Sequence, residues 1–206
     1  MQQIAVVFHS RFGNTKSLAE SIAKGVATET GVAAVSVDVT NIDDVNWDEL
    51  NRSKGMIFGS PTYLGSASAK FKIFMERTSL IWADQQWRDK FAGAFTTSGN
   101  PSGDKLQTLT QLCVFAAQHG MHWINPGIKP SQKIDGFDGV LNKAGGWLGV
   151  MATSIKASEQ KSFIDTDDLM TGFVFGQRFA KIVCSIPNAN ELSHAREMMR
   201  QKGDGK

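Results

Sequence analysis

The sequence has few cysteines, little net charge and no long hydrophobic run. Its two cysteines, Cys113 and Cys184, are far apart and lie within apolar helical patterns, which argues against a disulfide framework and against a metal site with closely spaced ligands. A net charge of +2, scattered along the chain, argues against a nucleic-acid or membrane-surface partner. These absences favour a protein of the reducing cytoplasm without a metal site.

Hydrophobic segments are too short for membrane insertion. No stretch approaches the roughly 18 to 20 apolar residues of a membrane-spanning helix, and the apolar run near the N-terminus is too short for a secretory signal. The 206 residues are 41% hydrophobic and 20% charged, a composition that supports one buried core. We therefore expect one domain over residues 1–186 and a polar, charged tail over residues 187–206.

Short apolar runs alternate with helical stripes along the chain. Runs typical of buried strands cover residues 4–8, 32–39, 56–59, 91–96 and 121–124. Between them, apolar residues recur at helical spacing, as in Leu18, Ile22 and Val26, and a last helix is expected over residues 167–184. The glycine-rich segment 125–157 fits neither pattern.

This alternation predicts an α/β fold. Strands joined by helices form right-handed βαβ units, and five of them favour a doubly wound, flavodoxin-like parallel sheet in the order 2-1-3-4-5 with helices on both faces. A ligand binds such a sheet beyond the carboxyl ends of its strands, at the switch point between the first and third strands. The loops after the first, third and fourth strands should therefore carry the chemistry.

The loop after the first strand has the composition of a phosphate site. It opens directly onto a helix, whose first-turn amides have no partner within the helix, so a phosphate can accept from them. Hydroxyl groups add donors, and a glycine lets the backbone approach the oxygens. The residues are Ser10, Arg11, Phe12, Gly13, Asn14 and Thr15. An ordinary capped turn is the alternative, because Ser, Asn and Thr are also good helix caps.

Several motifs together resemble the flavodoxin superfamily, and within it the tryptophan-repressor-binding-protein family of NAD(P)H:quinone oxidoreductases. Residues 10–15 resemble the phosphate loop of the superfamily, and residues 59–65, Gly-Ser-Pro-Thr-Tyr-Leu-Gly, resemble the segment that lies along the flavin. Residues 96–100 and the His-Gly-Met of residues 119–121 are similar to later motifs of the family. The matches follow the family's order over residues 1–125, although Tyr63 stands where the family commonly has arginine.

The resemblance implies an FMN site. It assigns the phosphate to residues 10–15, the N5 edge of the flavin to Pro61, Thr62, Tyr63, Leu64 and Gly65, and the pyrimidine end to the backbone amides of Thr97, Ser98, Gly99 and Asn100. Such amides would stabilise the negative charge of the reduced flavin.

Four residues are candidates for catalysis or substrate contact. By the resemblance, His119 lies over the flavin as a cofactor-binding and catalytic residue that holds a quinone oxygen or shares its proton. The alternative is a structural role, because a histidine before a glycine also suits a helix C-terminus. Phe12 and Trp82 would line the substrate pocket, and Trp147, which lies among glycines, would form a lid or a subunit contact.

The implied function is an FMN-dependent oxidoreductase. NADH or NADPH would deliver hydride to FMN, which would reduce a small acceptor such as a quinone, in a cytoplasmic homodimer or homotetramer. A flavodoxin-type electron carrier and a non-catalytic flavin-binding regulator are the alternatives. Carrier flavodoxins are typically strongly acidic, whereas this chain carries a net charge of +2, which favours the enzyme.

Overall fold

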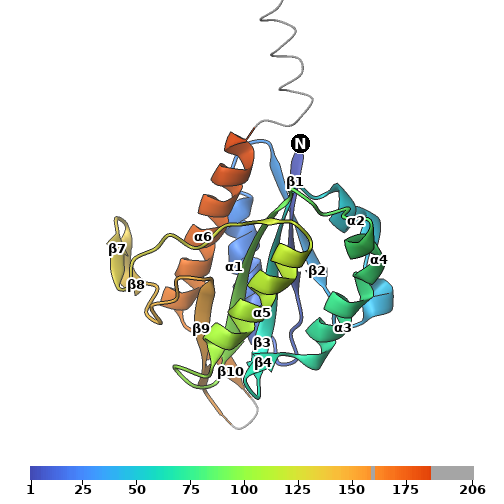
Figure 1. Cartoon of the computed structure of the whole chain (residues 1–206). Helices are drawn as coiled ribbons and strands as arrows, with labels where there is room; N and C mark the ends of the chain where they lie inside the picture. Colours follow the sequence, from blue (N-terminus) through green and yellow to red (C-terminus); the bar gives the residue numbers. More distant parts are fainter. Residues whose placement is uncertain (159–160, 187–206) are drawn as a thin grey trace, which may run out of the picture.

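A central sheet with helices on both faces forms the structure, a computed structural model that describes residues 1–158 and 161–186 (Figure 1). The expected tail, residues 187–206, lies outside the described residues. In the described part of the chain, no helix is both long enough and apolar enough to cross a membrane.

Five parallel strands form the middle of the sheet. In spatial order they are β2 (Val32–Asp38), β1 (Gln2–Phe8), β3 (Gly55–Tyr63), β5 (Phe91–Ser98) and β9 (Val150–Lys156). Neighbouring strands pair in parallel throughout this series. The α/β class and the flavodoxin-like arrangement are thus confirmed, with the chain reversing its direction of growth between β1 and β3.

The fifth strand is interrupted, which the sequence did not predict. The expected strand 121–124 reduces to β6 (His122–Trp123), which pairs only with Phe91 and Ala92 at the start of β5. The end of β5 pairs instead with β9, from Phe95↔Val150 to Ser98↔Thr153. Two strands, β6 and β9, therefore share the position beside β5. The segment between them lies outside the central sheet.

Additional antiparallel strands correct the prediction of a purely parallel sheet. At one edge, β10 (Ser162–Ile164) pairs antiparallel with β9, and β4 (Ser66–Ala67) folds back onto the end of β3. Within the interrupting segment, β7 (Gln132–Ile134) and β8 (Phe137–Leu141) form a separate hairpin that projects from the side of the molecule (Figure 1).

The helices divide between the two faces of the sheet. One face is covered by α1 (Asn14–Val26) and α6 (Thr166–Ser185), and the other by the 3-10 helix η1 (Ile42–Asp44), α2 (Trp47–Arg52), α3 (Ala69–Arg77), α4 (Ser79–Ala83) and α5 (Lys105–Gln118). Helices α1 and α6 approach closely because Gly176 has no side chain: a methyl group there would lie 2.2 Å from the Ile22 carbonyl oxygen.

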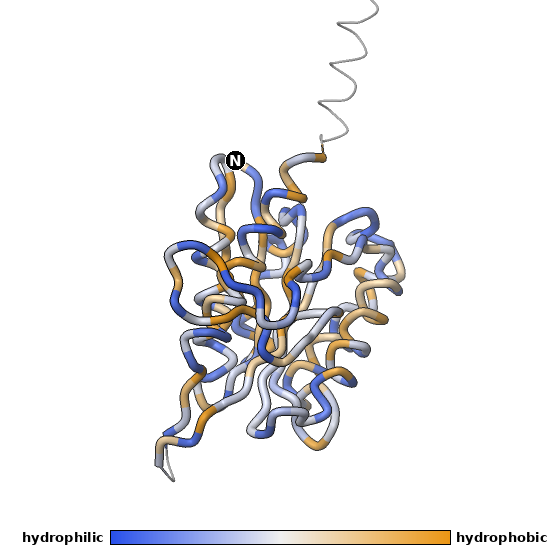
Figure 2. The backbone as a smooth tube through the Cα atoms, turned by 90° about the vertical axis from the view of Figure 1, so that its left-hand side faces the viewer, coloured by the Kyte–Doolittle hydropathy of each residue, from blue (hydrophilic) through white to orange (hydrophobic). Residues whose placement is uncertain are grey.

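Two apolar layers hold the sheet between these helices. One layer joins β1 and β3 to α1 and α6 through residues such as Ile22 and Phe175, and the other joins the opposite face to α3 and α5 through residues such as Phe58 and Phe74. Hydrophobic and hydrophilic residues alternate along the helices around the sheet, as Figure 2 shows. Side chains that alternate along each strand thus serve two cores, which leaves the strand ends for ligands.

Candidate functional site

Three loops meet at the carboxyl edge of the sheet and enclose a small cavity. They follow β1, β3 and β5, as the topology predicted, and the cavity has a volume of about 120 Å³. It is lined by Ser10, Arg11, Phe12, Asn14, Thr15, Pro61, Thr62, Tyr63, Thr97, Ser98, Gly99 and Ser154. Eleven of these twelve residues were predicted as cofactor-binding. A cavity of this volume is large enough for a phosphate group but too small for a whole nucleotide.

The amino end of α1 opens at this cavity without a side-chain cap. Gly13 occupies the cap position with a φ of 88°, in the left-handed region that favours glycine, and no atom lies within 4 Å of where its Cβ would be. The first turn contains no acidic residue. Its free amides and the positive end of the helix dipole therefore remain available to an anion.

One hydroxyl at the cavity has no partner among the residues that the structure describes. Ser10 Oγ is buried and makes no hydrogen bond, whereas the neighbouring hydroxyls are paired. Thr15 Oγ1 lies 2.9 Å from Thr97 Oγ1, and Thr62 Oγ1 lies 2.8 Å from Thr96 Oγ1. A buried unpaired polar group is costly, so a phosphate oxygen at this position would satisfy Ser10.

The rim of the cavity is aromatic and apolar. Phe12 is 69% exposed and carries the Arg11 guanidinium 5.1 Å above its ring, and Leu64 is fully exposed. Tyr63 is 37% exposed, and partial burial raises the pKa of its phenol, so the ring stays neutral at ordinary pH. An exposed apolar rim beside a polar cradle matches a ligand with an anionic end and a flat apolar ring.

Not every predicted binding residue lines the cavity, and one contributor was missed. Gly13, Leu64, Gly65 and Asn100 belong to the three loops but stand outside its lining. Ser154, which was not predicted, lines it from β9, and its hydroxyl donates to the Ser98 carbonyl at 3.2 Å. The sequence offered no signal for Ser154, because its strand lies in the segment that fitted neither pattern.

His119 lies at the other end of α5 from this cavity. Helix α5 begins at the carboxyl edge, spans about 21 Å, and ends beside the start of β5, where His122 pairs with Phe91. His119 is its C-cap residue and precedes Gly120, which has a φ of 69°. Within one chain, the structure therefore does not bring His119 to the three loops.

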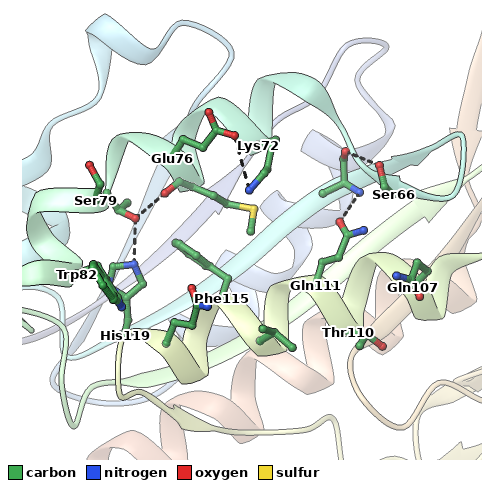
Figure 3. Close-up of a pocket in the computed structure, with 15 residues that line it drawn as sticks. Ser66, Lys72, Glu76, Ser79, Trp82, Gln107, Thr110, Gln111, Phe115 and His119 are labelled. Atoms are coloured by element: carbon green, nitrogen blue, oxygen red, sulfur yellow. Dashed lines mark hydrogen bonds and ion pairs between the residues drawn. The ribbon is translucent and has the colours of Figure 1, made fainter.

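His119 and Trp82 instead line a groove between α3, α4 and α5. The groove has a volume of about 910 Å³, and Figure 3 shows His119 and Trp82 together at one end and Ser66 and Gln107 at the other. Trp82 is 49% exposed. Two predicted site residues thus share a surface, but this surface is separate from the cavity between the three loops.

Burial keeps the imidazole of His119 neutral. It is 1% exposed and packs against Trp87 and Phe115, with ring centroids 4.7 and 4.8 Å away. Burial lowers the pKa of His119 from 6.5 to about 4. Nε2 lies 3.0 Å from Thr78 Oγ1, while the buried Nδ1 has no partner in the part of the chain that the structure describes.

Trp147 lies on the surface, 58% exposed, between β8 and β9. It does not line the cavity between the three loops. Its role as a lid or a subunit contact therefore stays a prediction.

The doubly wound sheet, with a polar cavity at its switch point, is the arrangement of a flavodoxin-fold FMN protein. A family model supports the same class: residues 8–133 match the NADPH-dependent FMN reductase family. The chain belongs to this family, which makes it an FMN-dependent oxidoreductase.

Relatives with similar sequences cover most of the chain. Flavodoxin FldP from Pseudomonas aeruginosa is 33% identical over 183 residues, which cover 88% of this chain and 97% of that protein. An NAD(P)H dehydrogenase (quinone) from Archaeoglobus fulgidus is 28% identical over 88% of this chain and 97% of that protein. The crystal structure of a flavodoxin, WrbA-like protein from Agrobacterium tumefaciens has 30% identity and a TM-score of 0.69, covering 90% of this chain and 99% of that one.

The residues present fit FMN. The uncapped helix end, the unpaired Ser10 hydroxyl and the open space at Gly13 suit its phosphate, and the exposed rim of Phe12 and Tyr63 suits its ring.

Proposed function

We propose that this protein transfers hydride from NADH or NADPH through bound FMN to a small acceptor such as a quinone. The observation that carries the proposal is the convergence of three loops on one cradle whose Ser10 hydroxyl is buried and unpaired. The relative from Archaeoglobus fulgidus named NAD(P)H dehydrogenase (quinone) supports the same donor and acceptor.

The protein's own residues would bind and orient the cofactor. FMN, when bound, supplies the redox chemistry. The amides at the start of α1 and the hydroxyl of Ser10 would hold its phosphate, as Thr15 positions this turn against Thr97. The exposed faces of Phe12 and Tyr63 would give a flat acceptor or a nicotinamide ring an apolar surface on which to stack.

An electron carrier is the second candidate, because a relative with 33% identity is named a flavodoxin. A carrier would exchange electrons with partner proteins and would not accept hydride from free NAD(P)H. The net charge of +2 favours the enzyme, since carriers usually dock through strong negative charge.

Anaerobic reduction separates the two candidates. Protein loaded with FMN is mixed with NADH or NADPH in separate cuvettes, and the visible flavin absorbance is followed before and after addition of a quinone. Rapid bleaching followed by return of the colour supports the enzyme and identifies its preferred donor. Flavin that remains oxidised with both donors, although dithionite reduces it, favours the carrier.

We also propose a homodimer or homotetramer in which the groove of His119 and Trp82 faces the FMN of a neighbouring subunit. The exposed Trp82 supports this arrangement, as does Nδ1 of His119, which has no partner among the described residues. His119→Ala should then lower quinone turnover while FMN stays bound. A monomer by light scattering, or unchanged turnover, would return His119 to its role at the helix end.

A further inference from the structure

A lysine is buried directly behind the loop that follows β5. Lys105, in the first turn of α5, is only 1% exposed. Its Nζ lies within hydrogen-bonding distance of four oxygens: Ser98 Oγ at 2.7 Å, the Asn100 carbonyl at 2.8 Å, the Pro101 carbonyl at 3.0 Å and Thr153 Oγ1 at 3.2 Å. A buried ammonium is costly, so this one is solvated by oxygens of the loop.

No carboxylate touches this ammonium in the described part of the chain. The ion pairs found there do not involve Lys105. The negative charge that acts on Lys105 is that of Asp168, across Thr153. The Thr153 backbone N–H donates to Oδ2 of Asp168 at 2.9 Å, while the Thr153 hydroxyl accepts from Lys105. Asp168 is 4% exposed, and burial raises its pKa, while burial lowers the pKa of Lys105. The positive charge is thus balanced only at a distance.

The lysine shapes the loop that lines the phosphate cavity. Ser98 and Gly99 line the cavity, whereas Lys105 does not. The carbonyl oxygens of Asn100 and Pro101 accept hydrogen bonds from the ammonium, so they point toward Lys105. Ser98, whose Oγ accepts from the ammonium at 2.7 Å, itself lines the cavity, so the field of the buried charge reaches the cavity through the protein interior, where it is weakly screened.

We propose that Lys105 is a positioning residue for bound FMN: it holds the loop of residues 98–101, and its positive charge favours the reduced form of the cofactor over the oxidised form. The inference rests on the FMN site of the proposed function but not on the choice of donor or acceptor. Reduction by two electrons with uptake of one proton adds one negative charge to the flavin. A nearby cation therefore stabilises the reduced form more than the oxidised form.

The test compares two neutral replacements of similar length. Lys105→Gln retains a donor for the loop carbonyls, whereas Lys105→Met removes both donor and charge. For each variant, the dissociation constants of oxidised and dithionite-reduced FMN are measured anaerobically, together with the midpoint potential. We expect both variants to lose about tenfold in the preference for reduced FMN, which lowers the two-electron potential by about 30 mV. Lys181→Gln, on the exposed surface of α6, serves as the control and should leave the potential unchanged.

Asp168→Asn gives a test with the opposite sign. Asn keeps an oxygen that accepts from the Thr153 N–H but removes the negative charge, so the potential should rise by a similar amount. This variant also keeps the proposal testable if the Lys105 variants do not fold.

The outcomes distinguish the possible roles of Lys105. Equal losses of affinity for oxidised and reduced FMN would overturn the redox role and assign the lysine to the phosphate. If the potential is normal in Lys105→Gln but shifted in Lys105→Met, Lys105 only supports the loop and its charge has no redox role. Faster hydrogen exchange of residues 98–101 in FMN-free Lys105→Met would show this support independently. Wild-type protein that binds FMN but rejects NAD(P)H contradicts only the proposed donor, whereas failure to bind FMN overturns the site itself.

Discussion

Thr15 Oγ1 and Thr97 Oγ1 lie 2.9 Å apart and join the first turn of α1 to the end of β5. Both side chains are buried, at 2% and 3% exposure, so each hydroxyl depends on the other for its hydrogen bond. Two loops that are far apart in the sequence are thereby held in one geometry before any cofactor binds. Ser10, on the same cavity, has a buried hydroxyl with no such partner.

This contrast predicts that Ser10→Ala weakens FMN binding without weakening the protein. The variant loses no hydrogen bond to the described residues, 1–158 and 161–186, so the melting temperature of the FMN-free form should stay the same or rise slightly. The lost bond to a charged phosphate should raise the dissociation constant of FMN about tenfold or more. Flavin fluorescence titration and thermal denaturation measure the two effects.

Thr15→Val is the matched comparison. It leaves the buried Thr97 hydroxyl unpaired, so the FMN-free protein should lose about 1 to 3 kcal/mol of stability. Unchanged FMN affinity in Ser10→Ala would show that its hydroxyl does not meet the phosphate.

The buried His119 should make the FMN-free protein sensitive to acid. Its folded pKa of about 4 lies below the unfolded value of 6.5, so between these values the unfolded state binds a proton that the folded state does not. The free energy of unfolding therefore keeps its full value above pH 6.5 and falls by about 2 to 3 kcal/mol as the pH drops toward 4. Urea unfolding at pH 7.5 and 4.5 should show a smaller decrease for His119→Gln than for the wild type. The same decrease in both proteins would rule out His119 as the source.

The turn between β3 and β4 should be improved by Leu64→Asn. Tyr63 pairs with Ser66, and the two turn residues, Leu64 and Gly65, have φ values of 48° and 80°, as in a type I′ turn. Leucine is strained in this conformation, whereas Asn-Gly is preferred there, and the fully exposed side chain loses no packing. We expect a gain of about 1 kcal/mol in the free energy of unfolding.

Leu80→Asn is the control for that change, because Leu80 is also exposed, at 77%, but lies in α4. Asparagine there should be slightly destabilising, since it is the weaker helix former. If both variants lose stability equally, the strain at Leu64 is not relieved by asparagine. Impaired quinone turnover in a stabilised Leu64→Asn would mean that the exposed leucine serves the site.

Asn142 should hold the interrupting segment to the core. Its Nδ2 donates to the carbonyls of Ile128 and Gly146, and its Oδ1 accepts from the Gly146 N–H. Asn142→Gly keeps the left-handed backbone, where φ is 51°, but removes all three bonds. We expect a loss of about 1 to 3 kcal/mol and faster hydrogen exchange over residues 128–146.

Ser131→Gly is the matched control, since Ser131 also has a positive φ, 55°, but is exposed. It should leave stability unchanged or slightly raised. Equal losses in Ser131→Gly and Asn142→Gly would attribute the effect to backbone freedom instead of the side-chain bonds.

The sequence predicted the shape of the loop after β1 because all of the information for that loop is local. A buried strand, then a glycine with hydroxyl residues, then an amphipathic helix is a pattern within about 20 residues, and Gly13 and Thr15 have the predicted places in the structure. The prediction of the fifth strand was wrong for the opposite reason, because that strand is made of two segments that are far apart in the sequence. Its two parts, β6 and β9, pair with the same neighbour, and only the sheet shows that Val150 continues where Trp123 stopped.

The sequence by itself determined the α/β class, the order of the first four main strands and the loops that enclose the cavity, since periodicity and turn residues specify local structure and topology follows from a few rules. Only the tertiary structure decided that His119 lies about the length of α5 away from the cradle and that Lys105 is buried behind it. Burial and distance depend on which segments pack together, and a lysine in the first turn of a helix has no sequence signal that distinguishes a buried charge from a solvated one.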